Sequence, residues 1–95
     1  MTYYVYILAS KRNGTLYVGS TADLISRIWL HKQKLLKSFT SRYDVDKLVH
    51  FEQFSDVGNM AQREKRLKKW KREWKIALIE KDNPEWVDLY DEIVR

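Results

Sequence analysis

The sequence contains no cysteine, one proline and three glycines among its 95 residues. The lack of cysteine excludes a disulfide framework, a thiolate nucleophile and a Cys-ligated zinc or iron–sulfur site. No uninterrupted apolar run approaches the roughly 20 residues that span a bilayer. The first residues alternate as a strand does, instead of forming a basic segment followed by an apolar one. We therefore expect a cytoplasmic protein that does not enter a membrane.

The composition is that of a small globular domain rich in aromatic residues. Hydrophobic residues make up 44% of the chain and aromatic residues 14%, including four Trp and six Tyr. Such side chains bury a large area in a chain that is too short for two ordinary domains. We therefore predict a single domain over residues 1–95.

Positive charge is concentrated in one segment. The whole chain carries a net charge of +5, whereas QREKRLKKWKREWK at residues 62–75 has eight Lys or Arg against two Glu, a local charge of +6. Lysine and arginine bind polyanions because they displace counterions from phosphates. The alternative for such a run is a solvated helix face.

The N-terminal segment is typical of a β-hairpin. Residues 3–9 and 15–19 are rich in aromatic and β-branched residues, and the SKRNG between them contains an Asn-Gly pair that tolerates positive φ. Ser20 and Thr21 then offer a hydroxyl N-cap for a helix over about residues 22–36. In that helix Asp23, Arg27 and His31 share one stripe, so Arg27 and His31 are expected to point together.

The remainder predicts a third strand and further helices. We expect a loop over residues 38–44, a strand over 45–54 with a structural His50, and a break at 55–59. Residues 60–80 predict one long helix or two abutting ones, with Trp70 and Trp74 as core anchors. A last helix is expected after Asn83-Pro84. The expected fold class is α+β, a three-stranded antiparallel sheet flanked by three to four helices.

Two short motifs and their spacing resemble a known family. YVY at residues 4–6, YVG at residues 17–19 and Arg27 on a following helix resemble the GIY-YIG endonuclease superfamily, most closely its small standalone bacterial branch. Tyr4 stands where the family name has Gly, and Val replaces Ile in both motifs. The resemblance covers nearly the whole chain and includes RIWLH, REKRLKKW and NPEW.

The resemblance implies a set of catalytic residues. Tyr6 and Tyr17 would line the site, with Tyr17 near the attacking water as candidate general base. Arg27 would contact the scissile phosphate, and His31 would assist. Glu64 would be the protein ligand of one divalent ion, Mg²⁺ or Mn²⁺. Phosphate contacts are expected from the basic segment, at Lys65, Arg66, Lys68, Lys69, Lys71 and Arg72.

These residue types suit phosphodiester hydrolysis. A planar guanidinium such as that of Arg27 can contact two non-bridging oxygens while negative charge develops on them. Hard ions such as Mg²⁺ prefer oxygen ligands and keep several waters, so Glu64 plus substrate can suffice. A tyrosine phenol has a reference pKa of about 10 and needs a nearby cation or base to act at neutral pH.

Each of these residues also has a structural alternative. Strand tyrosines commonly pack in cores. Arg27 can pair with Asp23 one turn earlier, and Glu64 with Lys68 one turn later. His31 is equally well explained as a satisfied or simply exposed histidine.

The leading hypothesis is a divalent-metal-dependent endonuclease that acts on DNA, with DNA favoured over RNA, in repair or recombination. A domain of this size has little surface for sequence reading, which favours structure-selective or partner-directed cutting. The first alternative is a non-catalytic nucleic-acid-binding module on the same scaffold. The second is a protein-interaction module whose basic helix binds an acidic partner.

Overall fold

The computed structural model describes residues 1–36 and 39–95. In these residues three strands and five helices follow one another along the chain. They are β1 (Tyr3–Ala9), β2 (Leu16–Thr21), α1 (Leu24–Lys32), α2 (Phe39–Arg42), β3 (Lys47–Phe54), α3 (Val57–Lys69), α4 (Arg72–Asp82) and α5 (Tyr90–Ile93). The sheet is antiparallel with strand order β2-β1-β3, which confirms the predicted α+β class.

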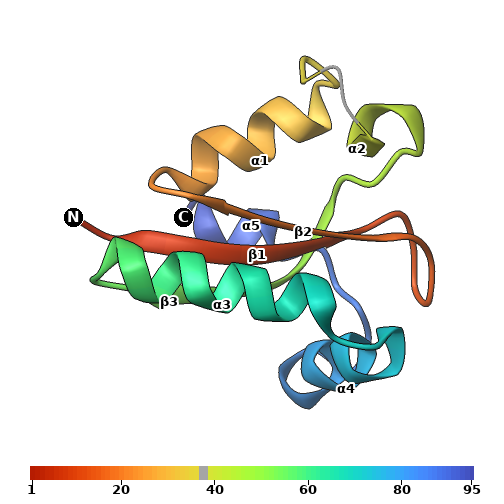
Figure 1. The fold of residues 1–95 in the computed structure, drawn as a ribbon. Coiled ribbons are helices and arrows are strands. Elements are labelled where there is room, and N and C mark those ends of the chain that lie inside the picture. Colours follow the sequence, from red (N-terminus) through yellow and green to blue (C-terminus); the bar gives the residue numbers. More distant parts are fainter. Residues whose placement is uncertain (37–38) are drawn as a thin grey trace.

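The two faces of the sheet carry separate hydrophobic clusters, because successive side chains of a strand point to opposite faces. Tyr6 and Leu8 of the central strand β1 pack with Leu24 and Ile28 of α1. Val5, Ile7 and Ala9 pack on the opposite face, where Leu67 of α3 and Ile79 of α4 cover them. Accordingly, α1 and α3 lie on opposite sides of the sheet in Figure 1.

The hairpin between β1 and β2 confirms the prediction, with one difference in its turn. Asn13 adopts the expected positive φ of 58°, whereas Gly14 does not. Gly14 is required for space instead, because a Cβ there would lie 2.3 Å from Ser10 Oγ. The backbone N–H of Ser10 donates to Thr15 O, and Arg72 from α4 donates to the carbonyls of Asn13 and Gly14.

Helix α1 is shorter than predicted at both ends. Its N-cap is Asp23, whose carboxylate accepts from the Ser26 N–H, and not Ser20 or Thr21. The Thr21 hydroxyl accepts from the Asp23 N–H and so orders the turn before the helix. At the other end Lys34 has a positive φ of 55°, which helical residues do not adopt.

Three other predicted boundaries also differ. The expected loop over residues 38–44 contains α2, although residue 38 itself lies outside the described residues. The expected break at 55–59 contains the start of α3, because the Asp56 carboxylate caps it by accepting from the Asn59 N–H. The third strand begins at Lys47 instead of residue 45.

The long basic segment forms two helices, the second of the two predicted arrangements. Trp70 and Lys71 adopt extended backbone angles between α3 and α4, with ψ of 147° and 148°. Trp70 packs against the core, as predicted. The prediction for Trp74 is wrong: it is 50% exposed and meets only the edge of the Trp70 ring, because the bend rotates α4 away from the register of α3.

The last helix is also shorter than predicted. Trp86 does not lie in it but in a turn with φ of 57°, buried on the α4 side of the sheet. The Asn83 side chain donates to Val49 O and Val87 O and accepts from the Val87 N–H, which fixes that turn. Leu89 and Tyr90 then pack with the α1 cluster, so the C-terminal segment reaches both faces.

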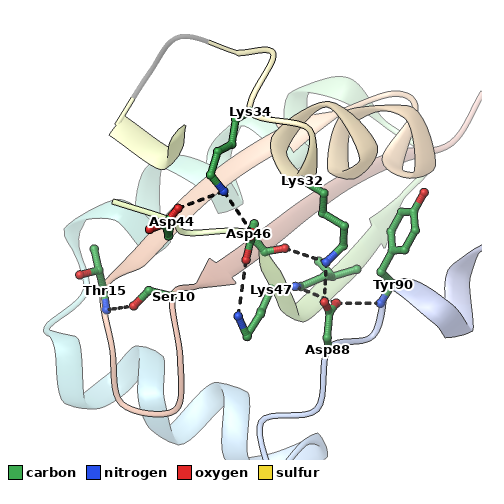
Figure 2. A network of polar contacts seen from close by, with 10 residues as sticks. Ser10, Thr15, Lys32, Lys34, Asp44, Asp46, Lys47, Asp88 and Tyr90 are labelled. Carbon is green, nitrogen blue, oxygen red and sulfur yellow. Dashed lines mark hydrogen bonds and ion pairs between the residues drawn. The ribbon is translucent and has the colours of Figure 1, made fainter. Parts of the chain in front are cut away.

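A polar network ties the C-terminal end of α1 to this segment (Figure 2). Lys32 Nζ lies 2.5 Å from Asp88 Oδ2 and donates to Asp46 O. The other oxygen of Asp88 accepts from the backbone N–H groups of Leu48 and Tyr90. This network holds α1 against β3 and the chain before α5.

A second polar cluster lies where β3 meets α3. The carboxylate of Glu52 accepts from Arg63 Nε and Nη2 at 2.8 and 3.0 Å and from the His50 ring at 2.8 Å. Burial raises the pKa of Glu52, but the hydrogen bonds from His50 and Arg63 outweigh it and lower the pKa to about 2. His50 therefore has the structural role that the sequence predicts.

Candidate nuclease site at the β2 edge

Two tyrosines meet over a glycine on the α1 face of the sheet. Tyr6 pairs with Gly19 and Leu8 pairs with Tyr17, and the Tyr6 and Tyr17 ring centroids lie 6.4 Å apart. A Cβ at Gly19 would lie 2.6 Å from Tyr6 Oη and 3.0 Å from Tyr17 Cε2. Only glycine therefore leaves room for the Tyr6 ring to cross β2 toward the free edge of the sheet.

His31 connects this pair to α1 and α2. Its Nε2 lies 3.0 Å from Tyr6 Oη and its Nδ1 lies 2.9 Å from Thr40 Oγ1. Its ring centroid is 5.8 Å from that of Tyr6 and 5.7 Å from that of Tyr17. His31 is 3% exposed. His31 is therefore a hydrogen-bonded buried histidine, not a simply exposed one. Its ring also contacts both tyrosines.

The protonation states of this cluster follow from burial and charge. Burial raises the pKa of Tyr6, as do Tyr17 and Glu64, while Arg27 opposes the rise. Burial and the charge of Arg27 lower the pKa of His31 below its usual value. At neutral pH Tyr6 is therefore a phenol and His31 a neutral imidazole. A neutral imidazole carries one ring proton, so one of its nitrogens donates and the other accepts in the contacts with Tyr6 and Thr40.

Glu64 approaches from the other side of the sheet. Its Oε1 accepts from the Ser20 hydroxyl at 2.6 Å, and its Oε2 lies 2.9 Å from Lys68 Nζ. Burial would raise the pKa of this carboxyl, but the hydrogen bonds from Ser20 and Lys68 outweigh it, so the pKa lies below its usual value. Glu64 is thus a carboxylate at neutral pH.

The site forms around the edge of β2. Ser20 pairs with Val5 and so faces α3, whereas its neighbour Gly19 faces α1. Because β2 is an edge strand, groups from both faces can approach each other there. The charge of Arg27 lowers the pKa of Tyr6, whereas the charge of Glu64 raises it. Tyr6, Tyr17 and His31 are in ring contact, Glu64 reaches the adjoining Ser20 of β2, and Arg27 of α1 is exposed to solvent.

The predicted phosphate-binding residues fall into two groups. All six are exposed. Three have partners within the chain: Lys68 pairs with Glu64, Lys71 lies over the Trp74 ring, and Arg72 binds the hairpin carbonyls. The other three are Lys65, Arg66 and Lys69 on the exposed side of α3.

Glu64 is a single carboxylate in this site. Among residues 1–36 and 39–95, no three His, Cys, Asp or Glu side chains cluster as a multidentate metal site does. One hard oxygen donor that is ionised and partly exposed suits an ion that keeps most of its waters. The donor set therefore fits Mg²⁺ or Mn²⁺ better than zinc, which takes three or four protein ligands.

Two residues of the site were not predicted from the sequence. Ser20 orients the Glu64 carboxylate, and Thr40 hydrogen-bonds the His31 ring. Both contacts join residues far apart in the chain, so no local pattern indicates them. The position of Ser20 directly after Gly19 is the one signal that could have pointed to it.

Comparisons with known proteins agree with this geometry. Residues 2–77 match the GIY-YIG catalytic domain family. A UPF0213 protein of Syntrophus aciditrophicus is 37% identical over 86% of this chain and 93% of its own length. One of Staphylococcus haemolyticus is 33% identical over 82% of this chain and 94% of its own.

A solved structure shows the same fold. The solution NMR structure of a UPF0213 protein from Bacillus halodurans aligns with a TM-score of 0.55 and 28% identity over 87% of each chain. No helix in the described part of this chain is long and apolar enough to cross a membrane. The family match covers both tyrosine motifs, Arg27 and Glu64. The chain therefore belongs to the GIY-YIG family of nuclease-type catalytic domains.

Proposed function

We propose that this protein is a divalent-metal-dependent endonuclease that hydrolyses phosphodiester bonds in DNA at the β2 edge. One observation carries the proposal: Glu64 of α3 binds Ser20 on β2, directly beside Gly19, over which the Tyr6 and Tyr17 rings meet on the α1 face. A guanidinium, a carboxylate and two phenols around one strand edge supply a phosphate clamp, a metal ligand and proton-transfer groups. The selectivity is for DNA structure, since the chain has little surface for base reading.

Arg27 binds the phosphate in this proposal. Its side chain is exposed, so it can contact substrate without breaking a buried ion pair. Its two terminal nitrogens contact two non-bridging oxygens, on which negative charge grows as the attacking water bonds to phosphorus. Lys65, Arg66 and Lys69 contact flanking phosphates and hold the strand in place.

The two tyrosines have different tasks because their burial differs. Tyr6 is 1% exposed and is hydrogen-bonded to His31, so it positions the cluster. Tyr17 is partly exposed and, in its phenolate form, would accept the proton of the attacking water, with the exposed Arg27 guanidinium supplying nearby positive charge.

Glu64 would hold the divalent ion through its partly exposed carboxylate, while Ser20 keeps that carboxylate oriented. When bound, the ion supplies Lewis-acid stabilisation of phosphate and leaving-group charge. Lys68 occupies one side of Glu64, but its side chain is 54% exposed and can turn into solvent. Exposed pairs of this kind contribute about 0.3–0.5 kcal/mol, so their displacement costs little.

The test is cleavage of a substrate panel with Mg²⁺ or Mn²⁺. The panel comprises duplex, nicked, gapped, flapped, branched and single-stranded DNA, with matched RNA. We expect cutting of at least one structured DNA, and its loss with Glu64→Ala and with chelator. The enzyme proposal fails if no substrate is cut under any condition, or if Glu64→Ala cuts as well as the unchanged protein.

The Lys68–Glu64 pair favours one second candidate, a non-catalytic nucleic-acid-binding module. In that case Lys68 neutralises the carboxylate permanently, and the scaffold only binds phosphates. This candidate predicts salt-sensitive binding without turnover, with Arg27→Ala weakening affinity slightly. Lys68→Ala distinguishes the two, because it frees Glu64 for the ion and should preserve or raise metal-dependent cutting in the enzyme.

A further inference from the structure

Helix α2 and the turn directly after it present two aromatic rings to solvent. Phe39 is 47% exposed and Tyr43 is 51% exposed, yet their ring centroids lie only 4.8 Å apart, with a tilt of 47°. The Tyr43 N–H donates to Phe39 O at 3.1 Å, so the two residues lie one helical turn apart and both project from one side. Exposed apolar residues that occur singly need no explanation, whereas an adjoining aromatic pair indicates a binding surface.

The rings are carried by a fixed support. Thr40 between them is 2% exposed, and its hydroxyl lies 2.9 Å from His31 Nδ1. Asp44 has a φ of 56° and the Val45 N–H donates to Thr40 O, a Schellman closure of the helix C-terminus. Lys34 at the end of α1 pairs with Asp44 at 3.0 Å (Figure 2). Little ordering entropy is therefore lost when a flat ligand binds the rings.

The segment that carries the rings is connected to the proposed cleavage site. A continuous set of hydrogen bonds runs from Thr40 through His31 to Tyr6. Figure 1 places α2 at the C-terminal end of α1, on the α1 side of the sheet. Because α2 lies at the C-terminal end of the helix that carries Arg27, a nucleic-acid strand with its phosphate at Arg27 can run along α1 and bring a nearby nucleotide to Phe39 and Tyr43.

We propose that Phe39 and Tyr43 form a stacking platform for an unpaired nucleobase next to the scissile phosphate. The bases of a continuous duplex stack on one another, so only an unpaired base can offer its face to these rings. The preferred substrates are then single strands, flaps and gaps, which specifies the structure selectivity of the proposed endonuclease and rests on that proposed function. Stacking tolerates any sequence, because every base has a π-face.

The charge around the platform suits this ligand. Arg42 in α2 is exposed and can contact the phosphate attached to the stacked base. The acidic residues nearby are Asp44 and Asp46, and Lys34 contacts both. Because Lys34 offsets these carboxylates, the platform can accept a polyanion.

The experiment measures binding in EDTA, where cleavage is absent. The probes are a single-stranded oligonucleotide carrying 2-aminopurine and the same sequence fully paired. The variants are the double substitution Phe39→Ala with Tyr43→Ala, and Phe39→Leu with Tyr43→Leu, which keeps apolar area but removes the rings. The matched control is Trp74→Ala, an equally exposed aromatic residue on α4.

The unchanged protein should bind the single strand more tightly than the duplex and quench 2-aminopurine. Removal of the rings should weaken single-strand binding by about 10-fold or more and abolish the quench. The duplex affinity of the ring variants, and both affinities of Trp74→Ala, should change less than about twofold. The leucine variant should behave as the alanine variant does.

The proposal is overturned if the ring variants retain their native circular dichroism and single-strand affinity. It is also overturned if the leucine variant retains the affinity, or if the rings affect only self-association in sedimentation. Should either double variant unfold, Tyr43→Ser against Tyr43→Phe repeats the comparison at one exposed position, with loss of affinity expected only for serine. Ring-dependent binding without metal-dependent cutting would refute the endonuclease and leave the platform standing.

Discussion

Glu52 and Glu64 lie at opposite edges of one sheet. Two consecutive residues of α3, Arg63 and Glu64, reach these two edges. Arg63 extends to Glu52 on β3, and Glu64 itself extends to Ser20 on β2. Both carboxyl groups have lowered pKa values. Their partners differ, however, and that difference separates a structural carboxylate from a candidate functional one.

Glu52 is saturated by groups that cannot leave easily. Arg63 contacts both oxygens of Glu52, and the Arg63 guanidinium lies 5.0 Å from the centre of the Trp70 ring. The buried His50 is hydrogen-bonded to one oxygen of Glu52. Glu64 instead has one hydroxyl and one lysine whose side chain is 54% exposed. A metal ion or a phosphate can therefore approach Glu64 but not Glu52.

The largest effect is expected from replacing Arg27 at the β2 edge, compared with replacing Arg63, which faces the β3 edge. Arg27→Ala should lower the cleavage rate by about 10²- to 10³-fold, because it removes the charge that stabilises the phosphate. Arg27→Lys should recover little of that rate, since an ammonium lacks the planar fork. Single-turnover cleavage at saturating protein measures this.

Arg63→Ala is the matched control. It should cleave nearly normally at a temperature where it remains folded, because Arg63 faces Glu52 at the opposite edge. If Arg63→Ala loses cleavage as severely as Arg27→Ala while still folded, the division between the two edges is wrong.

The second effect concerns stability. Glu52→Gln should lower the free energy of unfolding by about 1.5–3 kcal/mol, because it leaves the Arg63 guanidinium without its anion. Glu64→Gln should change it by less than about 1 kcal/mol, since the Lys68 pair is exposed. Urea titration of both variants gives the two values, and equal losses would contradict the distinction.

The pH dependence of the free energy of unfolding in acid should reveal the same role of Glu52. A glutamate in the unfolded chain has a pKa near its usual 4.5, whereas the pKa of Glu52 in the folded protein is about 2. The unfolded state therefore binds more protons in this window, and stability falls as the pH decreases from 4.5 to 2. Glu52→Gln should flatten that part of the curve.

A smaller loss is expected when Gly19 is replaced. In Gly19→Ala the new methyl would lie 2.6 Å from Tyr6 Oη, so the Tyr6 ring must move away from His31. We expect about 1–3 kcal/mol of destabilisation together with reduced cleavage. Gly58→Ala is the control, because its new methyl approaches only the Asp56 carboxylate, at 3.0 Å. Equal thermal stability of the two variants would refute the close packing at Gly19.

The smallest effect is the pH dependence contributed by His31. Its pKa in the folded protein lies below 6.5, so the unfolded state binds the proton first as the pH falls. Stability should therefore decrease as the pH drops below 6.5, and His31→Gln should lack this component. Thermal unfolding between pH 7.5 and 5 measures it, and a rise in stability on acidification would reverse the assignment.

The strands were predictable because their pattern is local. Alternating apolar residues and the Asn-Gly turn locate β1, β2 and most of β3. The bend at Trp70–Lys71 has no Gly or Pro to signal it, so the exposure of Trp74 could not be predicted. The inward direction of Arg63, by contrast, could be predicted. Arg63 lies four residues before Leu67 and seven before Trp70, on the inward stripe of α3.

The site was predictable only in part. The motif spacing identifies Tyr6, Tyr17 and Arg27, and the structure places the phenols and His31 in ring contact. Thr40 could not be found, because its hydrogen bond to His31 depends on how α2 folds back. No sequence pattern shows that Glu64, which approaches from the α3 face, lies at the same edge of β2 as the residues of the α1 face.

The most direct test of that shared edge is paramagnetic broadening by Mn²⁺ in amide NMR spectra. Titrated Mn²⁺ should broaden the signals of Gly19 and Ser20 first, and those around Arg27 next, because the ion binds Glu64 at the β2 edge. Glu64→Gln should remove this pattern, whereas Glu52→Gln should leave it intact. Broadening centred on β3, or a pattern that persists in Glu64→Gln, would contradict the account.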